Sequence, residues 1–249
     1  MGKMKSPSGS RGRLFGALVI IVVFVVAVGA VLAWLAFFTG TCAIKTVVIK
    51  GNEHLTVEHI RERSGVDSYT RLITLPVGHL DENLENDPWV KEAKVGRHLL
   101  NTVNIDVIER KPVAVVDFGG VGFMVNGEAH VMAQVTVDEF PELPRVHGGD
   151  ASVPTVDSRV NSKKIRECIQ VVGDMPAELR ATLALVNPYD GRGYVFISRD
   201  GYNIIYGAAS ECSRKNEILE AIITEIRSNN RRVEYIDVTV PDCPVIRPF

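Results

Sequence analysis

Six histidines and several acidic residues are the side chains of this chain best suited to acid–base or metal chemistry. The histidines are scattered, and His54 and His59 lie five positions apart, whereas two zinc ligands on one helix face lie four apart. No Gly-x-Ser-x-Gly elbow, Walker loop or HExxH motif occurs. The acidic candidates fall in segments that we expect to be solvated: Asp81, Glu82, Glu85, Asp87 and Glu109. A glycosidase-like pair of carboxylates stays open, because such pairs meet only in the fold.

Glycines and cysteines are the other residues that could hold a ligand. The cluster Gly119-Gly120-Val121-Gly122 fits a hairpin turn better than a phosphate-binding loop. The four cysteines form no CxxC pair, so a structural zinc site is not expected. A disulfide between Cys212 and Cys243 and two free thiols are both open. We therefore expect no metal, no cofactor, no small-molecule substrate and no enzymatic activity.

One apolar run indicates on which side of a membrane these residues lie. The 25 residues from Leu14 to Phe38 carry no charge. As a helix they would span about 37 Å, enough to cross a hydrocarbon core of about 30 Å. The apolar core of a cleaved signal peptide has only about 7–15 residues. Basic residues in the first 13 positions predict that this end is cytoplasmic. We expect a cytoplasmic tail at 1–13, a transmembrane anchor helix at 14–38 in contact with membrane lipid, and an extracytoplasmic remainder.

The charge of that remainder excludes one class of partner. Four of the 28 basic residues and none of the 30 acidic residues lie in the first 13 positions, so the rest of the chain carries a net charge of about −6. Proteins that bind nucleic acid need a basic surface to displace counterions. We expect no nucleic-acid binding.

The first exported segment shows a β-α-α-β-β pattern. A β-branched strand at 46–50 precedes a helix that Thr56 can cap, and a second short helix surrounds Leu80 and Leu84. Strands follow at 89–95 and 102–107. Such an order gives a small sheet with two helices on one face. We expect Trp89 to pack beneath the helices against four apolar side chains, namely Val57, Ile60, Ile105 and Val107.

The second exported segment is β-rich, with helices among its strands. Strand-like runs lie at 113–118, 122–125, 131–135, 194–198, 203–206 and 233–240. Helical runs lie at 162–172, 177–184 and about 210–229, the last with a continuous apolar stripe. The predicted class is α+β: an anchor helix, a small sheet domain, and a β-rich domain with packed helices that ends in an edge strand.

Several motifs carry a family resemblance. Two are Val48-x-x-Gly51-Asn52 and Pro88-Trp89-Val90-x-x-Ala93-x-Val95. A third is Ile105-x-Val107-x-Glu109-Arg110-x-Pro112-Val113-Ala114. These resemble a POTRA domain of the bacterial cell-division family FtsQ/DivIB. Later segments resemble that family's β-rich domain: Leu143-Pro144-Arg145-Val146-x-Gly148, Arg199-Asp200-Gly201 with Ile204-x-Tyr206-Gly207, and Tyr235-Ile236-Asp237-Val238 with Val245-Ile246-Arg247-Pro248.

The resemblance implies a POTRA domain at 44–113 and an extracytoplasmic β domain at 114–249. It implies a non-enzymatic divisome scaffold in the cell membrane, single-pass and located at the division septum. The partners that it implies are FtsB/DivIC-like and FtsL-like coiled-coil proteins, and the process is control of septal peptidoglycan synthesis. The alternatives are a membrane-anchored extracytoplasmic enzyme and a POTRA-type transport or assembly protein. The 136 residues after position 113 are too few for a transport barrel.

The end of the chain is the predicted docking surface. The run 233–240 has strong strand propensity, and a last strand at a sheet edge leaves backbone groups free to pair with a strand from another polypeptide. The resemblance indicates the same place. The predicted docking residues are Tyr235, Val238, Val240, Val245 and Ile246. The alternative is an ordinary edge protected by the charges of Arg231, Arg232, Glu234 and Asp237.

Overall fold

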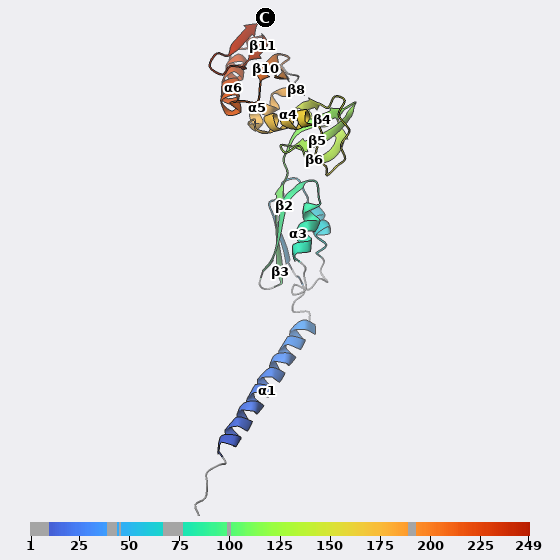
Figure 1. Ribbon diagram of the computed structural model, residues 1–249, viewed down its shortest axis with the longest axis vertical. Coiled ribbons are helices and arrows are strands. Elements are labelled where there is room, and N and C mark those ends of the chain that lie inside the picture. The colour runs from blue at the N-terminus through green and yellow to red at the C-terminus, as the bar shows by residue number, and fades with distance from the viewer. Residues whose placement is uncertain (1–9, 39–43, 45, 67–76, 99–100, 189–192) are drawn as a thin grey trace, which may run out of the picture.

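The protein is elongated, with its elements arranged one after another in space (Figure 1). A computed structural model describes residues 10–38, 44, 46–66, 77–98, 101–188 and 193–249. An N-terminal helix lies at one end, a small sheet with two helices follows, and a larger sheet with the C-terminus lies at the other end. Two separate hydrophobic cores correspond to the two sheets.

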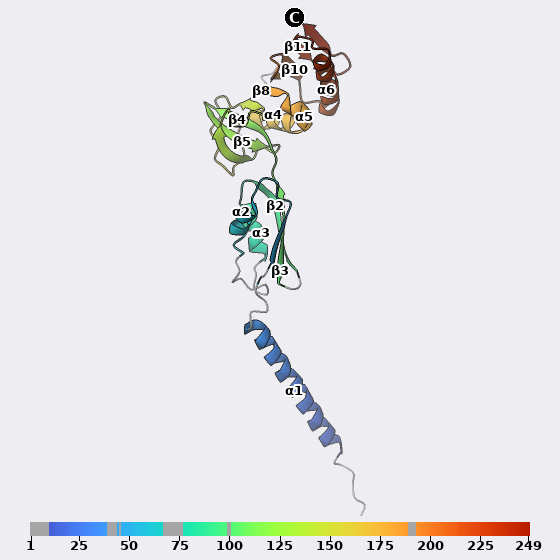
Figure 2. The ribbon, with the colours of Figure 1, turned by 180° about the vertical axis from the view of Figure 1, so that it is seen from behind.

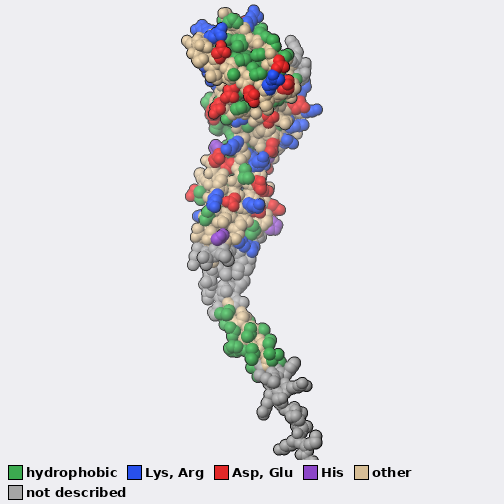
Figure 3. All heavy atoms as spheres, turned by 90° about the vertical axis from the view of Figure 1, so that its left-hand side faces the viewer, with side chains coloured by type: hydrophobic (Ala, Val, Ile, Leu, Met, Phe, Trp, Pro, Cys, Tyr) green, Lys and Arg blue, Asp and Glu red, His purple; other side chains and the backbone are tan. Residues whose placement is uncertain are grey.

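Helix α1 (Ser10–Phe38) contains the predicted anchor segment 14–38. The large apolar side chains described in α1 are exposed, from 41% at Val28 to 70% at Ile20, and Figure 3 shows them as green spheres around the helix. Among the residues that the structure describes with their side chains, no helix is long and apolar enough to cross a membrane. Cys42 and most of the predicted tail lie outside the described residues.

The smaller sheet has the order β1-β3-β2. Strand β3 (Thr102–Glu109) pairs in parallel with β1 (Thr46–Lys50) and antiparallel with β2 (Val90–His98). Helices α2 (Val57–Ser64) and α3 (Val77–Glu85) lie on one face of this sheet (Figures 1 and 2). The strict alternation of β3 places three buried side chains toward the helices, those of Val103, Ile105 and Val107.

Local signals set the ends of α2. The hydroxyl oxygen of Thr56 accepts a hydrogen bond from the backbone N–H of His59, which satisfies one free donor of the first turn. Gly65 ends the helix in the left-handed conformation, with φ of 67°, which glycine adopts without steric cost. The helix of the predicted pattern therefore begins and ends where these residues require.

Trp89 does not occupy the core position that we expected. Its side chain is half-buried, and its ring packs against the imidazole of His54 at a centroid distance of 5.8 Å. The reason is local: Trp89 precedes β2, and its N–H bonds to the Asp87 carboxylate at the corner of the domain. The core beneath the helices is filled instead by Leu84 and Val90, each 1% exposed.

The larger sheet has nine strands in the order β12-β11-β10-β9-β8-β7-β4-β5-β6. Its strands are β4 (Pro112–Phe118), β5 (Val121–Asn126), β6 (Val131–Thr136), β7 (Arg145–His147), β8 (Leu183–Asn187), β9 (Tyr194–Ser198), β10 (Asn203–Gly207), β11 (Val233–Asp237) and β12 (Val245–Pro248). Its helices are α4 (Lys163–Gly173), α5 (Ala177–Ala181) and α6 (Cys212–Ser228). Because β4 begins at Pro112, Val113 packs in this second core and not in the first domain, to which the sequence assigned it.

Two element boundaries differ from the sequence-based expectation. The helix predicted at 177–184 ends at Ala181, because the hydroxyl of Thr182 donates to the carbonyl of Leu179 and β8 begins one residue later. The strand predicted at 233–240 ends at Asp237, whose carboxylate accepts a hydrogen bond from the N–H of Thr239 and forms a turn.

A buried lysine fixes the connection from β10 to α6. Lys215 is 1% exposed, and its Nζ donates to the carbonyl oxygens of Tyr206 (3.1 Å) and Ala208 (2.8 Å). The ammonium also lies 5.1 Å from the centroid of the Tyr206 ring, within the range of a cation–π interaction. Burial lowers the pKa of Lys215. These contacts hold α6 against β10, and α6 in turn delivers the chain to β11.

Candidate partner-docking edge

Strand β12 forms one edge of the nine-stranded sheet. It pairs antiparallel with β11, with Ile246 opposite Ile236 and Val245 opposite Asp237. In the described part of the chain it pairs with no other strand, and all four of its residues are exposed. An exposed sheet edge presents unpaired backbone groups on which another chain can add a strand.

This arrangement corrects the predicted edge, which was 233–240. Strand β11 lies between β10 and β12 and therefore has no free edge. The chain turns back after β11, where the N–H of Cys243 donates to the carbonyl of Val240 and Pro241 is buried. The four residues after Pro244 thereby return along β11. Because their run is short and bounded by two prolines, its strand signal in the sequence is weak.

The five predicted docking residues fall into different environments. Val240 is 57% exposed, Val245 47% and Ile246 37%, whereas Tyr235 is half-buried. Val238 is fully buried, so its inclusion in the surface was wrong. The N–H of Val238 donates to the carbonyl of Ile205, and this hydrogen bond places Val238 beside β10, in the core.

Sequence reasoning missed one exposed aromatic residue. Phe249 is 86% exposed and directly follows β12. Its N–H donates to the carbonyl of Arg232, so the backbone continues the pairing with the segment before β11. We call the exposed apolar residues on and next to β12 the β12 apolar patch: Val240, Val245, Ile246 and Phe249. Val245 and Ile246 are adjacent in the strand, so their side chains project to opposite faces of the sheet. Figure 3 shows hydrophobic side chains gathered on one face of this domain among charged ones.

Charged residues around β12 are largely paired with one another. Nε of Arg247 lies 3.0 Å from Oε2 of Glu234, and its guanidinium lies 5.9 Å from the centroid of the Tyr235 ring. Arg214 of α6 forms an ion pair with Asp242 in the turn before β12. These contacts position the turn and the outer face of β12. Arg247 lies between Ile246 and Phe249 in the chain, and Asp237 lies opposite Val245, so charged residues flank the β12 apolar patch.

Of the two possibilities left open by the sequence, a Cys212–Cys243 disulfide and free thiols, the structure has free thiols. Both thiols are free; Cys212 is partly exposed and Cys243 is exposed. Cys168 is also free and is fully buried in the core, where desolvation raises its pKa to about 12. The turn before β12 is therefore held by hydrogen bonds and the Arg214–Asp242 pair.

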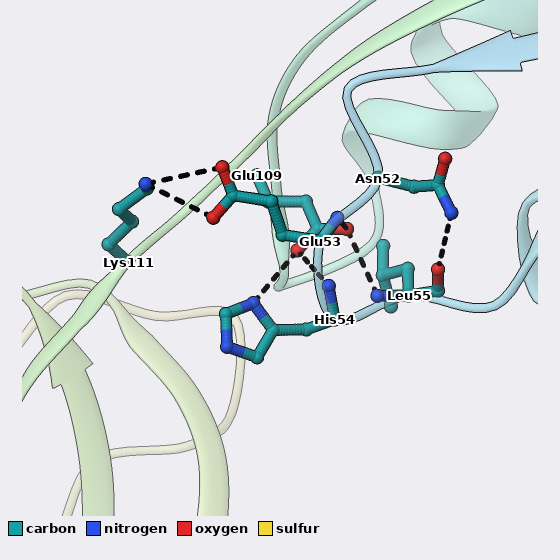
Figure 4. A network of polar contacts seen from close by, with 6 residues as sticks. All are labelled: Asn52, Glu53, His54, Leu55, Glu109 and Lys111. Carbon is teal, nitrogen blue, oxygen red and sulfur yellow. Dashed lines mark hydrogen bonds and ion pairs between the residues drawn. The ribbon is translucent and has the colours of Figure 1, made fainter.

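The acidic residues considered for catalysis have structural partners. Figure 4 shows the carboxylate of Glu109, at the end of β3, facing the loop after β1. It accepts hydrogen bonds from the backbone N–H groups of Glu53, His54 and Leu55 at 2.9, 2.9 and 3.0 Å. Glu109 is 7% exposed, which corrects the expected solvated position. Burial raises its pKa, but these hydrogen bonds outweigh that effect and lower the pKa below its usual value.

Asp87 is a second buried carboxylate in the smaller domain. It is 4% exposed, and Oδ2 lies 2.7 Å from Nε2 of His59 and 3.3 Å from Nε of Arg63. Burial raises the pKa of Asp87, whereas these partners and the N–H of Trp89 lower it to a net value below the usual one. Glu109 thus joins the end of β3 to the loop after β1, and Asp87 joins the residues before β2 to α2. No local pattern in the sequence indicates this, because their partners lie far away along the chain.

No metal centre is formed within the described ranges. In them, no three His, Cys, Asp or Glu residues lie close enough together to hold a metal ion. The β12 edge is the part of the larger sheet domain that we consider for recognition; β6 forms the other edge of that sheet.

Comparison with known proteins gives a family match and a set of relatives. Residues 42–110 match the family described as POTRA domain, FtsQ-type. "Cell division protein FtsQ" of Geotalea daltonii is 25% identical over 216 residues, which cover 84% of this chain and 77% of that protein. The protein of the same name from Streptomyces venezuelae is 22% identical and covers 98% of this chain and 90% of its own length.

Other similarities are more partial. "Cell division protein FtsQ" of Rickettsia felis is 27% identical over 110 residues, 44% of this chain and 41% of that protein. Among solved structures, the major extracytoplasmic domain of the cell-division protein DivIB from Geobacillus stearothermophilus has a TM-score of 0.34 and 16% identity. The match covers 49% of this chain and 97% of that domain.

Proposed function

We propose, from the premise that this chain belongs to the FtsQ/DivIB family of cell-division proteins, that it is a non-enzymatic scaffold of the division complex. In this role it binds small coiled-coil division proteins outside the cytoplasm, of the FtsB/DivIC and FtsL kinds, and helps to control septal peptidoglycan synthesis. The observation that carries the proposal is the free edge of β12 with its apolar patch.

Binding by strand addition suits this edge. Backbone hydrogen bonds supply affinity, and apolar side chains next to the edge supply specificity. Strand β12 has a single neighbour in the described part of the chain. Val245 and Ile246 are exposed within it, and Val240 is exposed in the turn before it. An exposed apolar patch on a soluble domain commonly marks an interaction site. Binding of this kind requires no catalytic residues.

The proposal includes a membrane location. Helix α1 contains 25 consecutive uncharged residues, and basic residues precede them. We propose that this segment is the single anchor, with the N-terminus in the cytoplasm and both sheet domains outside it. A fluorescently tagged chain should then collect at midcell in dividing cells. An impermeant thiol reagent should label Cys42 in intact spheroplasts; labelling only after lysis would reverse this topology.

Glutamate substitutions at the patch test the docking role. We expect Val240→Glu and Ile246→Glu to abolish co-purification of the coiled-coil partner with the full chain, because each places a charge in an apolar contact. Val153→Glu is the matched control, since Val153 is 61% exposed and belongs to the loop between β7 and α4. Wild-type capture by both patch variants would exclude the β12 edge and favour the POTRA face.

A further inference from the structure

The two sheet domains are joined by a very short connection. Strand β3 ends at Glu109 and β4 begins at Pro112, so Arg110 and Lys111 alone lie between them. Figures 1 and 2 show the domains meeting at a narrow junction. The N–H of Arg110 donates to the carbonyl of Trp89 at 2.8 Å, and Lys111 precedes a proline, which favours an extended backbone. The connection therefore allows only a limited range of orientations between the domains.

A turn of the larger domain lies directly beside this connection. Pro112 is paired with Asn126, the last residue of β5, and the turn to β6 follows Asn126. The side-chain oxygen of Asn126 accepts the backbone N–H groups of Glu128 (3.0 Å) and His130 (2.9 Å). Asn126 is 5% exposed, so the turn is anchored in the larger domain. These hydrogen bonds hold Glu128 next to the smaller domain.

A further contact fixes the backbone of the same turn. Nε of Arg159, in the loop before α4, donates to the carbonyl oxygen of Glu128 at 2.8 Å. The N–H and the C=O of Glu128 are thus both bonded within the larger domain. Because this backbone is already ordered, an ion pair made by Glu128 has to order only its side chain.

The carboxylate of Glu128 faces two cations that lie before the larger domain in the chain. Oε1 is 3.2 Å from Nζ of Lys91 in β2, and Oε2 is 4.0 Å from a terminal guanidinium nitrogen of Arg110. Lys91, by hydrogen bond and charge, lowers the pKa of Glu128, and the charges of Arg110 and Arg159 lower it further. The carboxylate is therefore ionised at neutral pH, and both contacts are attractive.

The two ion pairs differ in their exposure to solvent. The side chains of Lys91 and Glu128 are 53% and 56% exposed, so water and salt screen the attraction between them. The side chain of Arg110 is only 16% exposed. A mostly buried guanidinium needs an opposite charge nearby, and Glu128 supplies one from the larger domain. A rotation of one domain against the other would separate these charges.

We infer that Glu128 is a positioning residue that clamps the two sheet domains in one orientation relative to each other. Relative motion is the usual behaviour of domains that share a small interface, so a specific contact is needed to prevent it. The inference goes beyond the proposed function, because it holds whichever surface binds a partner. Its consequence is that the surfaces of the larger domain keep a fixed direction relative to the smaller domain.

Distances between two spin labels measure this orientation. The labels are attached at Glu62→Cys on α2 and Glu220→Cys on α6, both exposed positions. Cys168 is fully buried and is kept. The full chain is purified in detergent with serine at the other three cysteines, namely Cys42, Cys212 and Cys243. Pulsed electron paramagnetic resonance then gives the distribution of label–label distances. We expect one narrow distribution for this parent chain at low salt.

Charge reversal at Glu128 should release the clamp. In Glu128→Lys, three cations lie close together, so we expect the ratio of other orientations to the clamped one to rise about fivefold, which corresponds to about 1 kcal/mol. Adding Lys91→Glu restores one pair of opposite charges and should narrow the distribution again. Glu167→Lys is the matched control, because Glu167 pairs with Lys163 inside α4 at 3.7 Å. This control should leave the distribution unchanged.

Salt tests the clamp without any substitution at the junction. At 1 M NaCl the Debye length is about 3 Å, so the distribution of the parent chain should widen toward that of Glu128→Lys. Equal thermal midpoints of the parent chain and Glu128→Lys, measured by circular dichroism, would exclude unfolding as the cause of a wider distribution.

Two results would overturn the inference. One is a distribution that Glu128→Lys leaves unchanged, and the other is a broad distribution in the parent chain at low salt. If Glu128→Lys does not fold, the salt series decides: widening supports the clamp, and no widening overturns it. None of these measurements includes a partner, so their outcome is independent of whether the proposed function holds.

Discussion

Nδ1 of His54 lies 3.2 Å from Oε2 of Glu109, although the two residues are 55 positions apart in the chain. The same carboxylate accepts the three consecutive backbone N–H groups of residues 53–55. It thereby closes the loop after β1 onto the last residue of β3. Lys111 then pairs with Glu53 across the start of the connection to β4 (Figure 4). The carboxylate therefore joins two segments at the end of the POTRA domain that leads to the larger sheet.

Glu109→Gln should destabilise the smaller domain in a pH-dependent way. The folded pKa of Glu109 lies below its usual value of 4.5, so the carboxylate contributes stability above that pH and loses it as the pH falls through the folded pKa. We expect the variant to lower the free energy of unfolding by about 2 kcal/mol at pH 7. The difference in the free energy of unfolding between the variant and wild type should become smaller below pH 4.5.

Urea denaturation at pH 7 and at lower pH measures this effect. Fluorescence of Trp89 reports on the smaller domain when Trp34→Phe removes the other tryptophan of the chain. Glu62→Gln is the control, because Glu62 is exposed on α2. If the free energies of unfolding of Glu109→Gln and wild type differ by the same amount at every pH, the charge of the carboxylate is not what stabilises the loop.

Trp89 should matter less for stability than its size suggests. The ring is half-buried against His54, whereas Leu84 is 1% exposed in the core. We expect Trp89→Ala to lower the free energy of unfolding by about 1 kcal/mol and Leu84→Ala by about 3 kcal/mol. Urea denaturation followed by circular dichroism compares the two variants. A larger loss of free energy of unfolding for Trp89→Ala would indicate that Trp89 is packed in the core.

Val238 and Val240 are two positions apart but should respond differently to truncation. Val238 is fully buried, so Val238→Ala should lower the free energy of unfolding by about 2 kcal/mol through lost burial and the cavity that remains. Val240 is 57% exposed, and Val240→Ala should change the stability by less than about 0.5 kcal/mol. Thermal denaturation distinguishes the two. Equal losses would mean that the turn after β11 is packed more tightly than its exposure indicates.

The three thiols of the β domain should react in the order of their exposure. In a Cys42→Ser background, a maleimide should label Cys243 first and the partly exposed Cys212 more slowly. Cys168 should react only after unfolding, because burial removes access and raises its pKa to about 12. Mass spectrometry of timed samples gives the order. Labelling of Cys168 in the folded chain would reveal an opening of the core around α4.

Elements with strong local signals could be predicted from the sequence. The Thr56 cap and Gly65 mark the ends of α2, and the alternation of β3 marks its buried face. Strands β7 and β8 have no comparable signal, because they are short and their stability comes from pairing with strands far away in the chain. The role of the buried carboxylate of Glu109 is similarly hidden, since its partners lie more than 50 residues earlier in the chain.

The exposed sheet edge was predictable in part. The apolar residues after the last strong strand run lie at this edge, and three of the five predicted residues are exposed on β12 or in the turn before it. That they bind a partner stays a prediction. The error at Val238 came from combining both faces of one strand: Ile236 and Val238 share the buried face, and strand alternation already contains that information. The identity of the edge was not predictable, because a four-residue strand that follows one proline and ends in another forms only when β11 is present to pair with it.

The position of β12 at the end of the strand order also has a consequence for biosynthesis. A chain emerging from the ribosome and the export machinery completes β4–β10 first, then α6, and only then the two strands that end the sheet. Until α6 has packed through Lys215 and β11 has joined β10, β12 has no template on which to form. A chain that is still being synthesised, or one truncated before β12, therefore lacks this edge and ends the sheet at another strand. If β12 binds the partner, as proposed, such a chain cannot assemble through it.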